Sequence, residues 1–425
     1  MLLYENKKYK NESKVEVHRV ISIRFGQGSR KAVETRKGAL AESIRLRRAI
    51  RLVWQITFVR LSCKRRAIAV CQGAESIWAF FGSEASLVFS ERRPFSVYAL
   101  TKTAYTHILK KKTSEIYLFA DIGRKDLIMK TPIFKGAATA LITPFKNHAI
   151  DFEAFGEIID AQIAAGIDAL VICGTTGEAS TLTDDEQISA IEYAVKRVAG
   201  RVPVIAGAGS NDTDHAISLC RRSCEVGADA LLVVTPYYNK TSQKGLIHMY
   251  TRIADSVDKP LILYNVPSRT GMNIEPSTYA ALADHPNING IKEAGGNFSK
   301  IMETVALVGD KLALYSGNDD QIVPMLSLGG SGVISVLSNV LPAETSAICH
   351  KFFEGDVKGS LELQCKYLGL TNALFSDVNP IPVKEAMAML GYCGAEMREP
   401  LYPMDEAKKA ILREKLIEAG LAVKD

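Results

Sequence analysis

Several features that mark special classes of protein are scarce in this chain of 425 residues. It has two tryptophans, seven histidines and eight cysteines, and no two cysteines are spaced as Cys-x-x-Cys. Scattered thiols without clustered histidines do not form a metal site, and they are typical of a reducing compartment. We therefore expect no metal and a cytoplasmic location. No other set of residues suggests a nucleotide or a flavin, so we expect no cofactor.

Long apolar runs are also missing. The most apolar stretch in the first part of the chain, residues 50–63, is interrupted by Arg51 and Arg60. It falls short of the roughly 20 residues that a membrane-spanning helix needs. The first residues also lack the basic, then apolar, then small-residue order of a secretory signal. We expect no membrane partner.

Acidic residues are scarce only in the first part of the chain. Residues 1–128 hold 26 Lys and Arg against 11 Asp and Glu, whereas residues 129–425 hold 26 against 36. Few stretches of the basic part keep a helical or strand period, so we expect residues 1–128 to be a basic N-terminal extension of doubtful order, not a folded domain.

Three interpretations of this extension are open. It is sequence upstream of a true start at Met129, a tether for nucleic acid or an acidic surface, or a targeting peptide. Its length and its two tryptophans argue against a targeting peptide. The break in charge and pattern favours a start at Met129.

From residue 136 onward, short apolar runs alternate with stretches of helical period. Thr183 and Glu186 form a capping-box pair ahead of one such helix, which Gly200 ends. Runs that are apolar throughout are typical of strands covered on both faces, as in a parallel sheet with crossover helices. Eight runs predict an α/β fold, a (β/α)8 TIM barrel: 137–142, 169–173, 204–208, 230–234, 261–266, 290–294, 312–316 and 332–337.

We expect the barrel over residues 129–340 and a C-terminal helical region over 341–425, which caps the barrel or contacts another subunit. In such a barrel the chemistry lies at the carboxyl ends of the strands. Lys292 is the only cationic side chain within the eight runs. Burial lowers the pKa of a lysine and leaves a free amine that can form a Schiff base with a carbonyl. The alternative is a structural ion pair, for which Glu293 is unsuited because neighbouring strand residues face opposite ways.

The other strand ends offer mainly hydroxyl groups and one guanidinium. Thr175 and Thr176 lie at a strand-to-helix turn that suits a small carboxylate, or they cap a helix in an ordinary turn. Tyr264 and Tyr238 each follow a strand, where a phenol relays protons or packs its ring. Arg269 holds a carboxylate with two hydrogen bonds, or forms a surface ion pair.

Three motifs in these positions resemble those of a known family. Residues 174–178 (Gly-Thr-Thr-Gly-Glu), 264–271 (Tyr-Asn-Val-Pro-Ser-Arg-Thr-Gly) and 290–294 (Gly-Ile-Lys-Glu-Ala) closely resemble the dihydrodipicolinate synthases, pyruvate-dependent class I aldolases. The likeness spans about residues 134–421 and includes 332–336 and 379–384. None of it touches residues 1–128.

The resemblance implies a catalytic set. Lys292 would form the Schiff base with pyruvate, and Tyr264 would donate and accept protons beside it. Thr175 would link Tyr264 to Tyr238 in a proton relay. Tyr238 would reach in from a neighbouring subunit, and family members are usually homotetramers built from tight dimers.

The resemblance also implies the substrates. Thr176 and Ile334 would contact pyruvate, and Arg269 would receive the carboxylate of L-aspartate 4-semialdehyde. The enamine of pyruvate would attack the aldehyde, and the amine of the second substrate would then close the ring and free Lys292. This would be the committed step towards diaminopimelate and lysine.

Two other functions stay open. N-acetylneuraminate lyases and 2-keto-3-deoxy sugar acid aldolases share the barrel and the lysine, but they generally lack the arginine that stands here as Arg269. A non-catalytic barrel with a nucleic-acid-binding extension is the remaining hypothesis. The presence of Lys292, Tyr264 and Thr175 disfavours it, so we expect no nucleic acid partner.

The chain departs from lysine-inhibited members of the family where their effector site is expected. Asp184 and Gln187 stand where inhibited bacterial enzymes tend to carry histidines, and His215 replaces an expected glutamate. Asn211 and Tyr237 remain compatible with such a site. Because the ammonium groups of lysine lose an acidic partner, we predict weak or absent feedback inhibition.

Overall fold

The computed structural model describes residues 2–7, 20–25, 56–59, 68–71 and 130–424. The chain divides into two compact units, Met1–Leu127 and Ile128–Asp425. The described parts of the first unit are two antiparallel strand pairs, β1 (Leu2–Lys7) with β2 (Val20–Phe25) and β3 (Ile56–Val59) with β4 (Ile68–Cys71). The other predictions for residues 1–128 fall outside the described residues.

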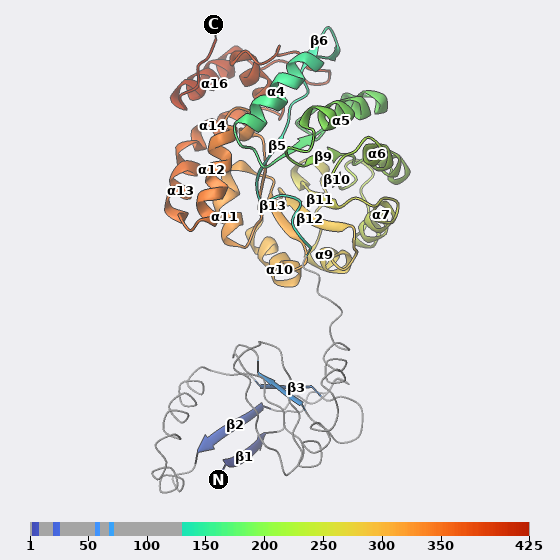
Figure 1. The fold of residues 1–425 in the computed structure, drawn as a ribbon, viewed down its shortest axis with the longest axis vertical. Helices are drawn as coiled ribbons and strands as arrows, with labels where there is room; N and C mark the ends of the chain where they lie inside the picture. Colours follow the sequence, from blue (N-terminus) through green and yellow to red (C-terminus); the bar gives the residue numbers. More distant parts are fainter. Residues whose placement is uncertain (1, 8–19, 26–55, 60–67, 72–129, 425) are drawn as a thin grey trace. The chain divides into compact units, whose positions relative to one another are not determined.

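Eight parallel strands of the second unit close into a barrel (Figure 1), which confirms the predicted (β/α)8 fold. Neighbouring strands in the barrel are also successive along the chain, and the last pairs with the first. Their residues are almost all buried, because one set of side chains faces the barrel interior and the other faces the helices. The strands are β5 (Gly136–Ala140), β8 (Ala169–Ile172), β9 (Val204–Gly207), β10 (Ala230–Val234), β11 (Leu261–Asn265), β12 (Ile288–Glu293), β13 (Ala313–Ser316) and β14 (Gly332–Ser335).

Most strand boundaries differ from the prediction by one or two residues, and two of the larger differences have an identifiable reason. β5 ends at Ala140, two residues early, because the amide of Ile142 donates to Oδ1 of Asn339 (3.1 Å) and not to a neighbouring strand. β12 begins at Ile288, two residues before the predicted start. The prediction began later because the second residue of the strand, Asn289, is polar and interrupts the apolar pattern. The Nδ2 of Asn289 donates to the carbonyl of Thr131 (3.0 Å).

Helices cover the outside of the barrel (Figure 1). The predicted capping box is present in α5: Thr183 and Glu186 exchange side-chain and backbone hydrogen bonds. That helix ends at Val198, and Ala199 and Gly200 both have positive φ. The helices of this layer are α4 (Phe152–Ala164), α5 (Asp184–Val198), α6 (Thr213–Glu225), α7 (Gln243–Asp255), α8 (Pro267–Thr270), α9 (Pro276–Leu282), α10 (Phe298–Val308) and α11 (Ile322–Ser327).

A C-terminal group of helices follows the last barrel strand, as predicted. It packs beside β5 and the end of β14, and the chain then runs away from the barrel (Figure 1). Its members are α12 (Pro342–Phe353), α13 (Val357–Lys366), α14 (Leu368–Leu374), α15 (Ile381–Met389) and α16 (Glu406–Glu418). None of the described helices is long and apolar enough to span a membrane.

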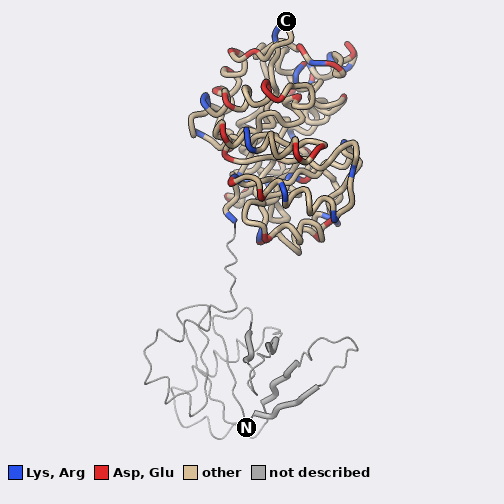
Figure 2. The backbone as a smooth tube through the Cα atoms, turned by 90° about the vertical axis from the view of Figure 1, so that its right-hand side faces the viewer, with Lys and Arg blue, Asp and Glu red and all other residues tan. Residues whose placement is uncertain are grey.

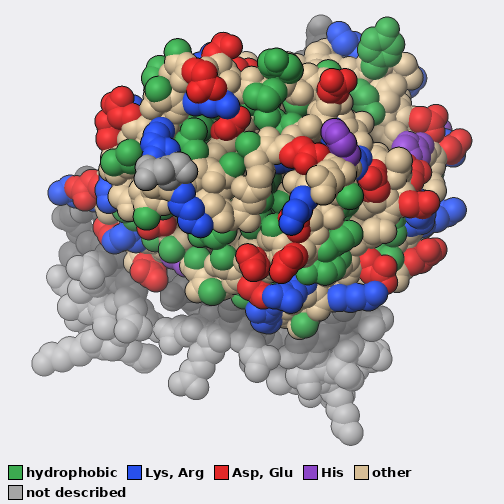
Figure 3. All heavy atoms as spheres, turned by 90° about the horizontal axis from the view of Figure 1, so that it is seen from above, with side chains coloured by type: hydrophobic (Ala, Val, Ile, Leu, Met, Phe, Trp, Pro, Cys, Tyr) green, Lys and Arg blue, Asp and Glu red, His purple; other side chains and the backbone are tan. Residues whose placement is uncertain are grey.

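Basic and acidic residues are interspersed along the backbone of the second unit (Figure 2). On the face seen in Figure 3, hydrophobic side chains are scattered among them. Such a surface is ordinary for a folded protein.

Candidate active site at the carboxyl ends of the strands

Lys292 lies in β12, between Tyr264 of β11 and Tyr315 of β13 in the strand register. Its side chain is buried, with 6% exposed. Within residues 130–424 no carboxylate forms an ion pair with it, and burial lowers its pKa to about 8. About a tenth of the lysine is therefore a free amine at neutral pH, far more than in an exposed lysine.

Tyr264 supplies a protonated phenol next to this amine. The Nζ of Lys292 lies 4.5 Å from the centroid of the Tyr264 ring. Burial raises the pKa of Tyr264, so the phenol keeps its proton at neutral pH, although a hydrogen bond from Thr175 acts in the opposite direction. The structure thus brings Lys292, Tyr264 and Thr175 together, as the sequence predicts.

Asp319 is a site residue to which the sequence analysis gave no role. Its side chain is buried, and Oδ2 accepts the backbone amides of Val336 (2.9 Å) and Leu337 (3.0 Å) just beyond β14. Oδ1 has no hydrogen-bond partner among the described residues. The carboxylate opposes the lowering of the pKa of Lys292. An acid placed directly after a barrel strand was the available signal.

Thr176 and Arg269 are joined by a residue from the C-terminal region. The Nδ2 of Asn379 donates to Oγ1 of Thr176 (3.0 Å), and Nη2 of Arg269 donates to the carbonyl of Asn379 (2.9 Å). Thr176 is buried, whereas Arg269 is exposed to solvent. Arg269 lowers the pKa of both Tyr264 and Lys292, which places its charge at the same end of the barrel.

Ile334 and Tyr238 lie in opposite environments. Ile334 is fully buried in β14 and belongs to the interior cluster that contains Tyr264. Tyr238 has 85% of its surface exposed, and its backbone amide donates to Oδ1 of Asn211 (2.8 Å). One chain by itself therefore groups Ile334 with Tyr264 and leaves the phenol of Tyr238 in solvent.

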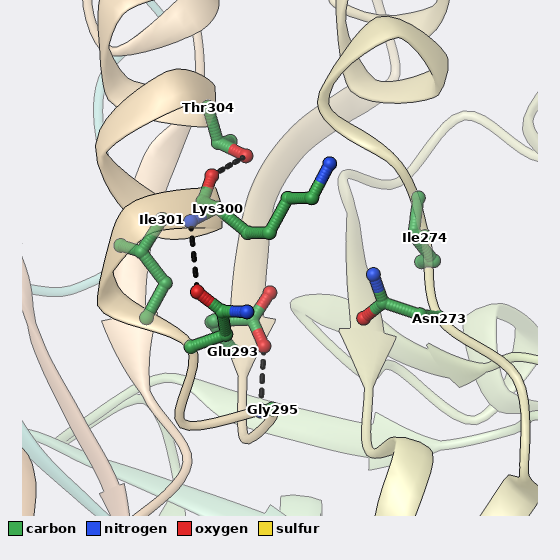
Figure 4. A pocket seen from close by; sticks show the side chains of 8 residues that line it. Asn273, Ile274, Glu293, Gly295, Lys300, Ile301 and Thr304 are labelled. Carbon is green, nitrogen blue, oxygen red and sulfur yellow. Dashed lines mark hydrogen bonds between the residues drawn. The ribbon is translucent and has the colours of Figure 1, made fainter.

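Glu293 faces the helices, on the opposite side of β12 from Lys292. Its Oε1 accepts the amide of Gly295 (2.6 Å), and both carboxylate oxygens accept from Nδ2 of Asn265 (3.0 Å). Figure 4 shows this carboxylate in a small pocket that Lys300 and Thr304 also line. Burial raises the pKa of Glu293. The expectation that Glu293 does not pair with Lys292 is met.

The residues expected at an effector site form a different contact. His215 Nε2 lies 2.9 Å from Oδ1 of Asp184, and its Nδ1 lies 2.9 Å from Oγ of Ser210. Gln187 is buried, and its Nε2 donates to the carbonyl of Gly207 (2.6 Å). An acid is thus present at this place, but His215 engages it.

Comparison with known proteins settles the family. The model of the Dihydrodipicolinate synthetase family matches residues 133–419. The chain belongs to this family. The resemblance seen in the three motifs is thereby confirmed, and the matched range begins after the basic extension.

Individual members of the family match over almost their whole length. The 4-hydroxy-tetrahydrodipicolinate synthase of Caldicellulosiruptor saccharolyticus is 53% identical over 295 residues, which are 69% of this chain and 100% of that protein. The crystal structure of dihydrodipicolinate synthase from Aquifex aeolicus is 44% identical, covers 69% of this chain and 100% of its own, and superposes with a TM-score of 0.68.

A third relative bears on assembly. A structure described as the first monomeric dihydrodipicolinate synthase variant is 41% identical, with a TM-score of 0.67 over 68% of this chain and 98% of its own. Members of this family therefore include at least one monomeric variant. Family membership does not by itself decide the oligomeric state.

Proposed function

We propose that this chain condenses pyruvate with L-aspartate 4-semialdehyde to give 4-hydroxy-tetrahydrodipicolinate, in the diaminopimelate route to lysine. Relatives of that name match the second unit at about half identity. The observation that carries the proposal is the buried amine of Lys292, with its pKa lowered to about 8, beside the protonated phenol of Tyr264.

The first half of the reaction joins pyruvate to the enzyme. The free amine of Lys292 attacks the ketone carbon of pyruvate, and the oxygen leaves as water once it has been protonated. Tyr264 gives that proton, and its hydrogen bond with Thr175 stabilises the phenolate that is left. The phenolate then takes a proton from the methyl group of the bound pyruvate, which gives the enamine.

The second half forms the new bond and releases the product. The enamine carbon attacks the aldehyde carbon of the semialdehyde, and Tyr264 protonates the resulting alkoxide. The amine of the semialdehyde next attacks the imine carbon, and the bond to Lys292 breaks. The ring closes, and the lysine amine is free for another turnover.

Thr176 and Ile334 bind pyruvate, and Arg269 binds the carboxylate of the semialdehyde. Thr176 is buried with its hydroxyl held by Asn379, and Ile334 lies in the cluster around Tyr264. Arg269 disfavours a sugar aldolase, because a polyhydroxyl chain would leave the guanidinium without a charged partner.

We also propose a cytoplasmic homotetramer, a dimer of dimers, in which Tyr238 completes the proton relay of a neighbouring subunit. The support is its exposed phenol and the family membership. Light scattering on the purified chain tests the assembly. A monomer with full activity would contradict the shared tyrosine.

The test of the reaction uses the full chain. We expect pyruvate to be consumed with L-aspartate 4-semialdehyde and not with N-acetylmannosamine. Borohydride reduction with pyruvate alone should add one reduced pyruvate to the peptide that contains Lys292, read by mass spectrometry. Turnover with the sugar only would reassign the chain to the neuraminate lyases.

Feedback by lysine is predicted to be weak or absent. The carboxylate of Asp184 already lies against His215 and is not free to bind an ammonium group. The measurement is the initial rate with increasing L-lysine. Strong inhibition below a millimolar concentration would show that this arrangement opens to admit lysine.

A further inference from the structure

A buried ion pair outside the reacting centre joins the barrel to the C-terminal helices. Lys384 of α15 and Glu178 both have fully buried side chains, and Nζ lies 2.6 Å from Oε1. Burial lowers the pKa of this lysine, and Glu178 opposes the change. Buried ion pairs often stabilise no more than apolar side chains of the same volume. Stability alone is therefore a weak reason for this pair.

The ion pair belongs to a set of hydrogen bonds around residues 174–177, which we call the active-site turn. The Nζ of Lys384 also donates to the carbonyl of Thr143 (2.9 Å). The hydroxyl of Thr143 donates to the carbonyl of Gly177 (2.7 Å), and Oε2 of Glu178 accepts the amide of Arg398 (3.1 Å). These bonds attach the active-site turn to the end of the first barrel strand and to the C-terminal region.

The same short segment of the C-terminal region, residues 379–384, contacts the turn at two places. At one end, Asn379 donates to the hydroxyl of Thr176 and accepts from Arg269. At the other end, Lys384 contacts Glu178, which directly follows the turn. Both contacts bridge about 200 residues of sequence.

We propose that Lys384 and Asn379 are positioning residues for pyruvate. Lys384, through Glu178, fixes the active-site turn against the C-terminal region, and Asn379 orients Thr176 for the carboxylate of pyruvate. This inference rests on the proposed function for pyruvate as the ligand and for Thr176 as a residue that binds it. Among the described residues no hydrogen bond or ion pair joins this segment to Lys292, so loss of its contacts should weaken binding and leave the chemistry of the amine in place.

The test measures how Schiff-base formation depends on pyruvate. Removing one partner alone leaves a buried charge and endangers folding, so the main variant is Glu178→Gln with Lys384→Met, which removes both charges. Folding is checked by circular dichroism. We expect the pyruvate concentration for half-maximal borohydride trapping of Lys292 to rise about tenfold, the effect of one lost hydrogen bond, with full trapping at saturation.

A matched control is Lys130→Met at the opposite end of the barrel. Lys130 donates to the carbonyls of Ala283 (2.7 Å), His285 (2.6 Å) and Ile288 (2.6 Å), so its loss tests the same change of side chain away from the turn. We expect this variant to keep the parental dependence on pyruvate. An equal shift in the control would mean that loss of stability, and not positioning, explains the effect.

Asn379→Ala provides an independent test, because it removes the bond to Thr176 without burying a charge. The same rise is expected, again with full trapping at saturation. The proposal is overturned if the double variant folds and needs the same pyruvate concentration for half-maximal trapping as the parent. If the double variant does not fold, the proposal is overturned by an Asn379→Ala variant that needs the parental concentration. Trapping needs no semialdehyde, so a parent chain that traps pyruvate but does not turn over overturns the synthase function alone.

Discussion

Two regions of the second unit each bury a lysine, and they use it differently. In the barrel interior, Lys292 has no ion-pair partner within residues 130–424, and burial lowers its pKa to about 8. At the junction with the C-terminal helices, Lys384 is buried more deeply but lies 2.6 Å from the carboxylate of Glu178. Burial disfavours both ammonium groups. Direct contact with the carboxylate of Glu178 opposes this effect at Lys384, whereas Lys292 has no such contact among the described residues.

The largest expected effect comes from replacing the buried lysine of the barrel interior by methionine, compared with the same replacement at the junction. Lys292→Met should lower turnover by about four orders of magnitude or more, because the nucleophile is lost, and should abolish trapping of pyruvate. The variant should remain folded, since an unpaired buried amine gives way to an apolar side chain. The paired variant Glu178→Gln with Lys384→Met should still be trapped at Lys292. A pyruvate adduct on another lysine would erase the distinction between the two regions.

Arg269 lies where the two regions meet, since it donates to Asn379 of the C-terminal region. Arg269→Ala should lower kcat/KM for the semialdehyde by about tenfold to a hundredfold, the loss of a charge-assisted pair. Trapping of pyruvate should change little. The ratio of the two effects is the measurement, taken by steady-state kinetics and by borohydride trapping. Equal losses would contradict a role in binding the second substrate.

Local patterns in the sequence predicted most of the barrel and pointed to the lysine that we propose as the reacting group. Eight apolar runs correspond to eight strands, and a capping-box pair marks the start of α5. Lys292 stands out because a charge within an apolar strand needs a reason. These signals are visible within a few residues of one another, so no spatial information is required to find them.

The supporting residues could not be found in the same way. Lys384 and Asn379 contact partners about 200 residues earlier in the chain, and such contacts leave no periodic trace. Asp319 was visible as an acid near a strand end. Only the structure shows that it is buried and accepts a backbone amide of the loop after β14. The end of β5 also differs from the prediction, because the amide of Ile142 bonds to the side chain of Asn339 and not to a neighbouring strand.

A smaller effect concerns the charge that opposes burial at Lys292. The carboxyl group of Asp319 raises the pKa of Lys292, so Asp319→Asn should lower it. In the parent, kcat/KM for pyruvate should rise with pH and level off above about 8, where the amine is free. In the variant this rise should move to lower pH. Asp320→Asn, an exposed neighbour, is the control and should leave the profile in place.

The smallest effect is expected from the first unit, which the family match does not include. A chain that starts at Met129 should keep kcat and KM within about twofold of the full chain, because every contact of the site described above lies within residues 130–424. The measurement is the same pyruvate assay on both chains, with retention on immobilised DNA at several salt concentrations as a second readout. Salt-sensitive retention of the full chain alone would instead show that the excess of 26 basic over 11 acidic residues in 1–128 serves a nucleic acid. Loss of turnover in the shortened chain would show that the barrel needs the first unit. The different environments of Lys292 and Lys384 would then not be enough to explain activity.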